Sequence, residues 1–393
     1  MQFRYFAHSW LSDWNHGNAH FLRGLATALV RRGHRVRAYE AMPTPAGGWS
    51  LSQLWDEPRG AEAVAAMRAA YPDIEVRLYG PGRAGRHWGV CASGARWVES
   101  WEEELASAEI VVAHEWNPPE LFAWLLEQRR RHGFRLLLHD THHRAVSNVG
   151  GLERLPLRQF DAVIAFGESL RRLYEQAGAR RSYSLHEAAD LEHVHPHAGD
   201  AAQTDLVWIG NGGDEERTVE LEEFLLEPAG TLGLRARMHG VRYPAGIQTR
   251  LRAAGMDYAG YLPNLEAPRA YAQAKLTLHI PRAPYARALP GIPTIRIFEA
   301  LACGAALLCA PWSDREGLFA AGEDYWPVAN GREMRAALKQ LLCDERQRMQ
   351  LGSHGAATIA AGHTCAHRAQ ALEEICHDLD PALASTCTPS VPA

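Results

Sequence analysis

The sequence predicts an α/β protein made of two Rossmann-like domains, each with a parallel sheet, that face one another across a cleft. Three observations predict this fold. The chain has 393 residues, more than the roughly 250–300 at which a single core stops growing. Several strand-like segments are continuous apolar runs, which are typical of buried parallel strands. A strand, a glycine-containing turn and a helix open the chain, and the same order recurs after residue 204.

The first half begins with a βαβ pattern. Gln2–Ala7 is a predicted strand, and the next helix carries Phe21, Leu22, Leu25 and Leu29 on one face before it ends at Arg31–Gly33. His34–Tyr39 is the second strand. Further strands are predicted at 109–113, 134–138 and 161–166, with a helix at 118–131 and another that Ser169 caps. The polar, proline-containing stretch 190–204 is typical of a linker, so we expect the first domain to span 1–195.

The second half repeats the pattern. Strand 205–209, turn 210–214 and helix 215–226 are followed by predicted strands at 235–240, 276–280 and 305–310 and by helices at 294–303, 332–342, 344–363 and 364–379. The second domain is expected at 196–363. We expect the tail 381–393 to be disordered, because it is rich in small residues, proline and threonine.

Composition excludes several function classes. The net charge is −5, and no basic stripe indicates nucleic-acid binding. Of the 41 basic residues only Lys275 and Lys339 are lysine, so a phosphate-binding loop of the Gly-Lys-Ser/Thr type is absent. Without a signal-like segment or a run of 18 apolar residues, a cytoplasmic protein is expected. Histidine clusters at 139–143 and 363–367 lack the further ligands that a zinc site needs, so no metal site is predicted.

The segment from Leu289 to Gly304 is the most informative one. A loop containing two prolines and a glycine leads into a helix that Gly304 ends. Backbone N–H groups at such a helix start favour an anion such as phosphate. Arg296 and Glu299 are three residues apart and share one face of the helix, where the arginine suits a diphosphate and the carboxylate suits ribose hydroxyls. The alternative is an ordinary amphipathic helix with an exposed ion pair.

This segment resembles the C-terminal signature of GT-B glycosyltransferases of the group 1 type. The run Arg296-Ile297-Phe298-Glu299-Ala300-Leu301-Ala302-Cys303-Gly304 is most similar to the CgeB-like, spore-coat-maturation-type branch. His16-Gly17-Asn18 with Arg32-Gly33-His34-Arg35-Val36, and Ala188-Ala189-Asp190 before Pro196, resemble further elements of the family in the same order. The resemblance implies the GT-B fold, a bacterial enzyme, and a last helix, about 364–380, that packs back on the first domain.

The resemblance also implies roles for residues of the second half. A nucleotide-diphospho-sugar, with UDP or GDP as the nucleotide, would be the donor substrate, and no cofactor or metal would be needed. Glu299 would hold the ribose. The donor-binding residues implied by the family are Gly210, Asn211, Gly212, Arg242, Arg282, Pro290, Gly291, Ile292, Pro293, Thr294 and Arg296, and Arg217 would neutralise the leaving diphosphate.

Two departures from the family pattern leave questions open. Many relatives have an arginine where this chain has Asn211. Retaining members often have a first glutamate where this chain has Gly291, so retention or inversion of the sugar configuration is open, and an inactive relative remains an alternative.

The first half would supply the acceptor side. His114 and the segment 139–143 follow two predicted strands, and ligands of parallel sheets bind at the carboxyl ends of strands. His114 or Asp140 could remove a proton from the acceptor if transfer inverts. The residues expected near the acceptor are Trp14, His16, Gly17, Asn18 and His142.

Three alternatives compete with a hexosyl-type glycosyltransferase. One is a nucleotide-sugar 2-epimerase on the same architecture, and another is a non-catalytic nucleotide-sugar-binding protein. A dinucleotide oxidoreductase is disfavoured, because Glu215 occupies the third glycine position of its loop motif. The acceptor is left open among glycans, lipids, small molecules and proteins, as is peripheral contact with a membrane.

Overall fold

The computed structural model describes residues 1–42, 48–80, 96–197, 202–212 and 216–386. Contacts divide the chain into two units, Met1–His186 with Cys365–Ala393 (unit 1) and Glu187–Thr364 (unit 2). The sequence analysis set the boundary after residue 195. It lies earlier because Ala189 bridges to Thr364, and Pro196 lies next to Gly304. The polar composition of residues 190–204 therefore did not mark the point at which packing changes.

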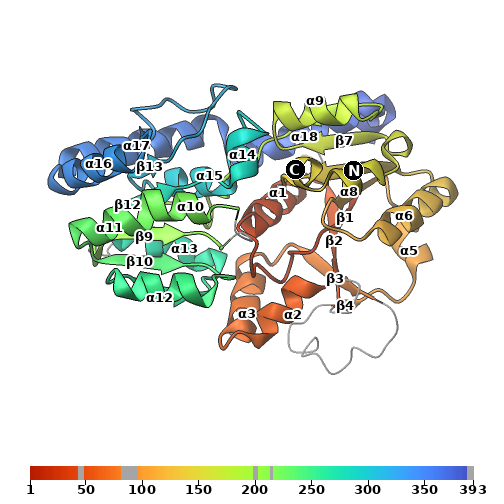
Figure 1. Cartoon of the computed structure of the whole chain (residues 1–393). Helices are drawn as coiled ribbons and strands as arrows, with labels where there is room; N and C mark the ends of the chain where they lie inside the picture. The colour runs from red at the N-terminus through yellow and green to blue at the C-terminus, as the bar shows by residue number, and fades with distance from the viewer. Residues whose placement is uncertain (43–47, 81–95, 198–201, 213–215, 387–393) are drawn as a thin grey trace, which may run out of the picture. The chain divides into compact units, whose positions relative to one another are not determined.

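Unit 1 contains an eight-stranded parallel sheet with the order β4-β3-β2-β1-β5-β6-β7-β8. In Figure 1 the labelled strands β7, β1, β2, β3 and β4 follow one another across this sheet. The order reverses its direction between β1 and β5, which is a topological switch point. The strands are β1 (Gln2–Phe6), β2 (Arg35–Ala41), β3 (Glu75–Tyr79), β4 (Arg96–Trp97), β5 (Ile110–His114), β6 (Arg135–Asp140), β7 (Ala162–Ala165) and β8 (Ser182–Ser184).

The helices of unit 1 include one from the end of the chain. They are α1 (Ala19–Arg31), α2 (Trp49–Asp56), α3 (Gly60–Ala70), α5 (Trp101–Ala106), α6 (Pro119–His132), α7 (Arg144–Ser147), α8 (Val149–Glu153), η2 (Leu157–Gln159), α9 (Glu168–Gln176), α18 (Cys365–Leu379) and η5 (Pro381–Thr386). Helix α18 packs on α1, and Glu373 forms ion pairs with Arg32 and His34.

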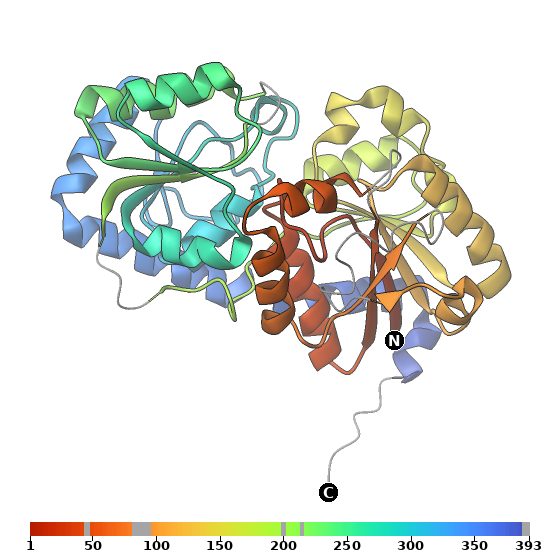
Figure 2. The same ribbon diagram turned by 90° about the horizontal axis from the view of Figure 1, so that it is seen from below.

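Unit 2 contains a six-stranded parallel sheet with the order β11-β10-β9-β12-β13-β14. This is the Rossmann order, with its switch point between β9 and β12. Figure 2 shows helices on both sides of this sheet. The strands are β9 (Thr204–Ile209), β10 (Ala236–His239), β11 (Asp257–Gly260), β12 (Ala274–His279), β13 (Leu307–Cys309) and β14 (Trp326–Pro327). The helices are α10 (Thr218–Leu221), η3 (Glu222–Leu226), α11 (Glu227–Leu232), α12 (Ala245–Ala253), η4 (Asn264–Glu266), α13 (Ala267–Ala272), α14 (Ala283–Arg287), α15 (Ile295–Ala302), α16 (Gly331–Cys343) and α17 (Glu345–Gly362).

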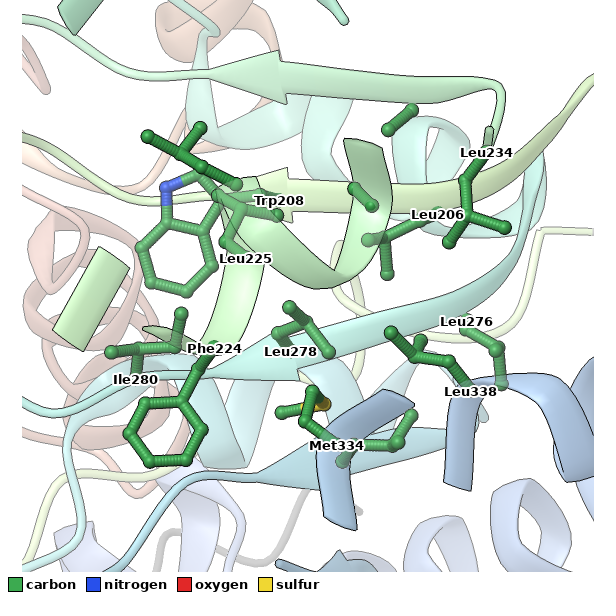
Figure 3. Close-up of a cluster of buried hydrophobic side chains, with 14 of the residues drawn as sticks. Leu206, Trp208, Phe224, Leu225, Leu234, Leu276, Leu278, Ile280, Met334 and Leu338 are labelled. Carbon is green, nitrogen blue, oxygen red and sulfur yellow. The ribbon is translucent and has the colours of Figure 1, made fainter. Parts of the chain in front are cut away.

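The core of unit 2 holds the strands against the helices. Leu206 and Trp208 of β9 lie beside Leu276 and Leu278 of β12, and Met334 of α16 packs against this layer (Figure 3). All five are nearly inaccessible to solvent. Burying such a side chain stabilises the fold by about 1.5–3 kcal/mol. These contacts therefore hold β9 and β12, and with them the carboxyl ends of both strands, in place.

The prediction of two parallel α/β sheets is confirmed. Three local predictions were wrong. Helix α9 has Gly167 at its N-cap, so Ser169 lies inside the helix. His139 and Asp140 are the last residues of β6, although the predicted strand ended at residue 138. The tail forms helix η5 up to Thr386, and residues 387–393 lie outside the described residues.

Within the described ranges, no helix is both long and apolar enough to span a membrane.

Candidate functional site

Two loops meet at the carboxyl ends of β9 and β10 in unit 2. A Cβ on Gly212 would lie 2.1 Å from the carbonyl oxygen of Arg242, and one on Gly210 would lie 2.5 Å from the ring of Trp208. Glycine is therefore required at both positions by close approach. Asn211 accepts a hydrogen bond from the backbone N–H of Val241 at 3.0 Å, which ties the two loops together. Residues 213–215 of the predicted turn lie outside the described residues.

The loop before α15 has the geometry of an anion site. Gly291 has φ 94°, a left-handed conformation that favours glycine. The Thr294 side chain does not cap α15, and instead its hydroxyl pairs with Nε2 of His279 at 3.1 Å. The first N–H groups of α15 are thus left without a side-chain cap, at the end of the helix where the dipole favours negative charge. Pro290, Ile292 and Pro293 complete this loop, and the carbonyl of Ile292 accepts a hydrogen bond from the Trp312 indole.

His279 at the end of β12 was not found from the sequence. It is buried, and burial together with the charge of Arg217 lowers its pKa to about 3. His279 is therefore neutral near pH 7, and it can orient Thr294 without adding charge to the loop.

Glu299 is fully buried. It forms an ion pair with Arg296, as the shared helix face predicts, and its Oε2 accepts a hydrogen bond from the Tyr271 hydroxyl at 3.1 Å. The alternative of an exposed Arg–Glu pair is wrong, because the Glu299 side chain is 0% and that of Arg296 18% exposed. Tyr271 of α13 was not found from the sequence, because it comes from a separate element.

Three arginines gather near these loops. Arg217 is 8% exposed, donates to the carbonyl of Ile280 at 3.1 Å and lies 5.5 Å from the centre of the Trp208 ring. Burial, then the charges of Arg282 and Arg296, lower the pKa of Arg217 from 12.5 to about 10. The described residues provide no carboxylate ion pair for Arg217, since the neighbouring Glu216 pairs with Arg282 at 3.2 Å. A buried positive charge without a counter-ion favours binding of an anion.

Arg242 differs from the other predicted arginines. It is exposed at the loop after β10 and has φ 63°. The backbone carbonyl of Arg242 lies against Gly212, where it leaves no room for a Cβ atom.

In unit 1, His114 and Asp140 end the neighbouring strands β5 and β6, and both are fully buried. His114 Nε2 lies 2.8 Å from the Thr141 hydroxyl, to which the Asn18 amide donates at 2.8 Å. Burial and the charge of Arg144 lower the pKa of His114 to about 3. His114 therefore lacks the near-neutral pKa that proton removal favours.

Asp140 is held by two hydrogen bonds. Its carboxyl accepts from the backbone N–H of His142 at 2.8 Å and from the Tyr174 hydroxyl at 2.6 Å. Burial raises the pKa of Asp140 well above its ordinary value. Both groups that the sequence analysis considered as bases are thus engaged inside unit 1.

The predicted acceptor-side residues do not all gather in one place. Trp14 is buried, and its indole donates to Glu57 at 2.7 Å and contacts Trp49. Gly17 contributes a carbonyl to His20. His16 lies beside the Trp116 ring, which also contacts His142, and its Nδ1 is 3.1 Å from Nε2 of His8.

Two charged residues that follow β5 and β6, Glu115 and Arg144, were not among the predicted site residues. Glu115 is 9% exposed, and burial raises its pKa to about 8. The Arg144 guanidinium lies 3.3 Å from the centre of the Trp116 ring. Their position directly after buried strands was the available signal, because the ends of neighbouring parallel strands lie together.

Among the residues that the structure describes, no group of three or more His, Cys, Asp or Glu side chains is arranged to hold a metal ion.

Comparisons with known proteins agree with this architecture. Residues 217–374 match a family model described as glycosyl transferase-like. No curated protein sequence matches the chain. Solved structures resemble it over nearly its whole length. Anabaena HepE in complex with UDP and glucose has 15% identity and a TM-score of 0.64, covering 95% of this chain and 99% of HepE.

Two further structures have the same fold. Sucrose-phosphate synthase from Thermosynechococcus elongatus has 14% identity and a TM-score of 0.66, covering 97% of this chain and 100% of the synthase. T4 phage BGT in complex with its UDP-glucose substrate has 13% identity and a TM-score of 0.51, covering 97% and 100%. The description of the family model favours a transferase over the 2-epimerase alternative. Residues 217–374 are thus similar to the glycosyl transferase-like family, and the solved structures show that the chain has the GT-B fold of two Rossmann-like parallel-sheet domains.

Proposed function

We propose that the chain transfers a sugar, in the first instance a hexose, from a UDP-sugar to an acceptor. The single observation that carries the proposal is Arg217, a buried guanidinium without a carboxylate ion pair among the described residues, near two further arginines. Glycosyl transfer releases a nucleoside diphosphate whose negative charge grows in the transition state, so fixed positive charge at that point accelerates the reaction. The solved complexes of HepE and BGT with UDP-glucose support UDP-sugars as the first donors to test.

In this proposal the diphosphate lies between the uncapped start of α15 and the arginines. Arg217, Arg282 and Arg296 supply the charge, and Thr294, oriented by His279, supplies a further donor. Glu299 accepts the ribose hydroxyls, held in place by Tyr271. The loops at Gly210–Gly212 approach the donor through their backbone.

The proposal gives His114 and Asp140 positioning roles. Their hydrogen bonds fix Thr141, His142 and Tyr174 at the ends of β5 and β6. Metal independence, a cytoplasmic location and the CgeB-like branch belong to the same proposal; the last is supported by the run Arg296–Gly304.

A donor screen tests this function. Thermal shifts are measured with UDP, GDP and TDP and their sugars, since a ligand that binds the folded state raises the melting temperature. Release of UDP from UDP-glucose is then followed with and without acceptors, in the presence and absence of EDTA. We expect UDP release that EDTA leaves unchanged and that Glu299→Ala abolishes. Tight UDP-glucose binding without turnover over a broad acceptor panel would instead favour the non-catalytic alternative.

A further inference from the structure

A second charged site lies at the switch point of the sheet in unit 1. His8 follows β1, Trp116 follows β5, and His142 and Arg144 follow β6. Ligands of open parallel sheets bind where neighbouring strands connect in opposite directions. All four side chains are partly exposed, so a ligand can reach them.

These residues form one connected group. The Arg144 guanidinium lies 3.3 Å from the centre of the Trp116 ring, and stacking of this kind leaves the N–H groups on the guanidinium edge able to donate. The Trp116 ring is 4.8 Å from the ring of His142 and 5.3 Å from that of His8. His8 in turn contacts His16 at 3.1 Å.

The charges in this group favour an anion. Arg144 has no ion pair with a carboxylate among the described residues, although Glu115 and Asp140 lie near enough to influence it. Burial raises the pKa of Glu115 to about 8 and that of Asp140 well above its ordinary value. Near pH 7 the neutral form of the Glu115 carboxyl is therefore favoured, while Arg144 keeps its charge. Burial disfavours the charged form of Asp140 as well. Nδ1 of His8 is buried and has no hydrogen-bond partner in the part of the chain that the structure describes.

We propose that Arg144, His142 and His8 bind an anionic group of the acceptor, and that this group is a phosphate monoester. The role as an acceptor site rests on the proposed transferase function, whereas binding of the anion does not. A phosphate monoester carries a charge of about −1.5 to −2 at pH 7 and three strong acceptor oxygens, which fits one guanidinium and two imidazoles. Trp116 supplies an aromatic face for the sugar that carries the phosphate.

The test uses glucose 6-phosphate, glucose and the intact chain. Unit 2 is first saturated with UDP, so that its arginines no longer offer a free phosphate site, and each sugar is then titrated by calorimetry. Variants Arg144→Gln and His142→Gln are compared with Arg154→Gln, a matched control at an exposed arginine of unit 1 that donates to the Gly150 carbonyl. Retained UDP affinity and an unchanged melting curve show that each variant is folded.

We expect glucose 6-phosphate to bind at least about 10-fold more tightly than glucose, and Arg144→Gln to remove this preference, because a charge-assisted hydrogen bond contributes roughly that factor or more. His142→Gln should weaken binding to a smaller extent, and Arg154→Gln should leave it unchanged. Equal binding of the two sugars, or full binding by folded Arg144→Gln, would overturn the inference. If the wild-type chain fails to bind UDP, the proposed function fails, and the same titration without UDP still decides whether the anion site exists.

Discussion

Replacing Arg217 by methionine should change the stability of unit 2 and its affinity for UDP in opposite directions. Burial and the charges of Arg282 and Arg296 lower the pKa of Arg217 from 12.5 to about 10. Since one pKa unit corresponds to about 1.4 kcal/mol, holding the charged form in this place costs about 3 kcal/mol. The hydrogen bond from Arg217 to the Ile280 carbonyl at 3.1 Å offsets about 1 kcal/mol of this cost.

Arg217→Met should therefore raise the free energy of unfolding by about 1–2 kcal/mol. For a unit of this size that is an increase of about 2–8 °C in melting temperature. The same variant should bind UDP about 10- to 100-fold more weakly, because hydrogen bonds to charged groups contribute about 1.5–3 kcal/mol.

Thermal denaturation and titration calorimetry with UDP measure the two effects. The matched control is Arg237→Met, because Arg237 lies in the same unit but is 39% exposed and pairs with Asp257. This control should change neither quantity by much, as surface ion pairs contribute about 0–1 kcal/mol. A less stable Arg217→Met variant with unchanged UDP affinity would refute the reasoning, since Arg217 would then be a structural residue.

Three further changes test other parts of the account. Glu299→Ala should weaken UDP binding at least about 10-fold but leave pyrophosphate binding nearly unchanged, because the carboxylate beside Tyr271 is assigned to the ribose. An equal loss of affinity for both ligands in calorimetry would contradict that assignment. Glu115→Gln should be more stable than the wild type by about 1–3 kcal/mol at pH 9 but not at pH 5. The pKa of Glu115 is raised from 4.5 to about 8 in the folded chain, so wild-type stability falls as pH rises between these values. A difference in stability between variant and wild type that does not depend on pH, measured by urea denaturation, would contradict this prediction. Gly212→Ala should destabilise unit 2 and weaken UDP binding, because its Cβ would lie 2.1 Å from the Arg242 carbonyl oxygen. The control Gly246→Ala, in open space on α12, should raise the free energy of unfolding by about 0.5–1 kcal/mol. Equal melting temperatures for the two variants would contradict the prediction.

The parallel sheets could be predicted because their central strands are unusually apolar. Ile110–Ala113 and Leu136–Leu138 are continuous buried runs with helices between them, and such runs need no long-range information. Strands β3, β4, β8, β11 and β14 were missed, and all of them except β3 lie at the edges of their sheets. They are short or carry charges, as in Glu75–Tyr79, and they become strands by pairing with a neighbour that the local pattern does not reveal.

The candidate site was predictable where one element carries it. Arg296 and Glu299 are three residues apart on α15, so the spacing alone places them on one face. Tyr271 and His279 reach the same region from other elements, and no sequence spacing connects them. The pKa values of His114 and Glu115 depend on burial and on Arg144. The sequence shows neither, which is why His114 and Asp140 were considered as bases and Glu115 was not identified as the group whose pKa is raised to about 8.

The most direct test of the central claim is a comparison of UDP with uridine in titration calorimetry on the wild-type chain. Three arginines and the uncapped start of α15 are assigned to the diphosphate, and hydrogen bonds to charged groups are the strongest that such a site offers. We predict a single site that binds UDP at least about 100-fold more tightly than uridine. Equal affinity for the two ligands, or no binding of UDP, would contradict the assignment of a nucleotide-diphosphate site to unit 2.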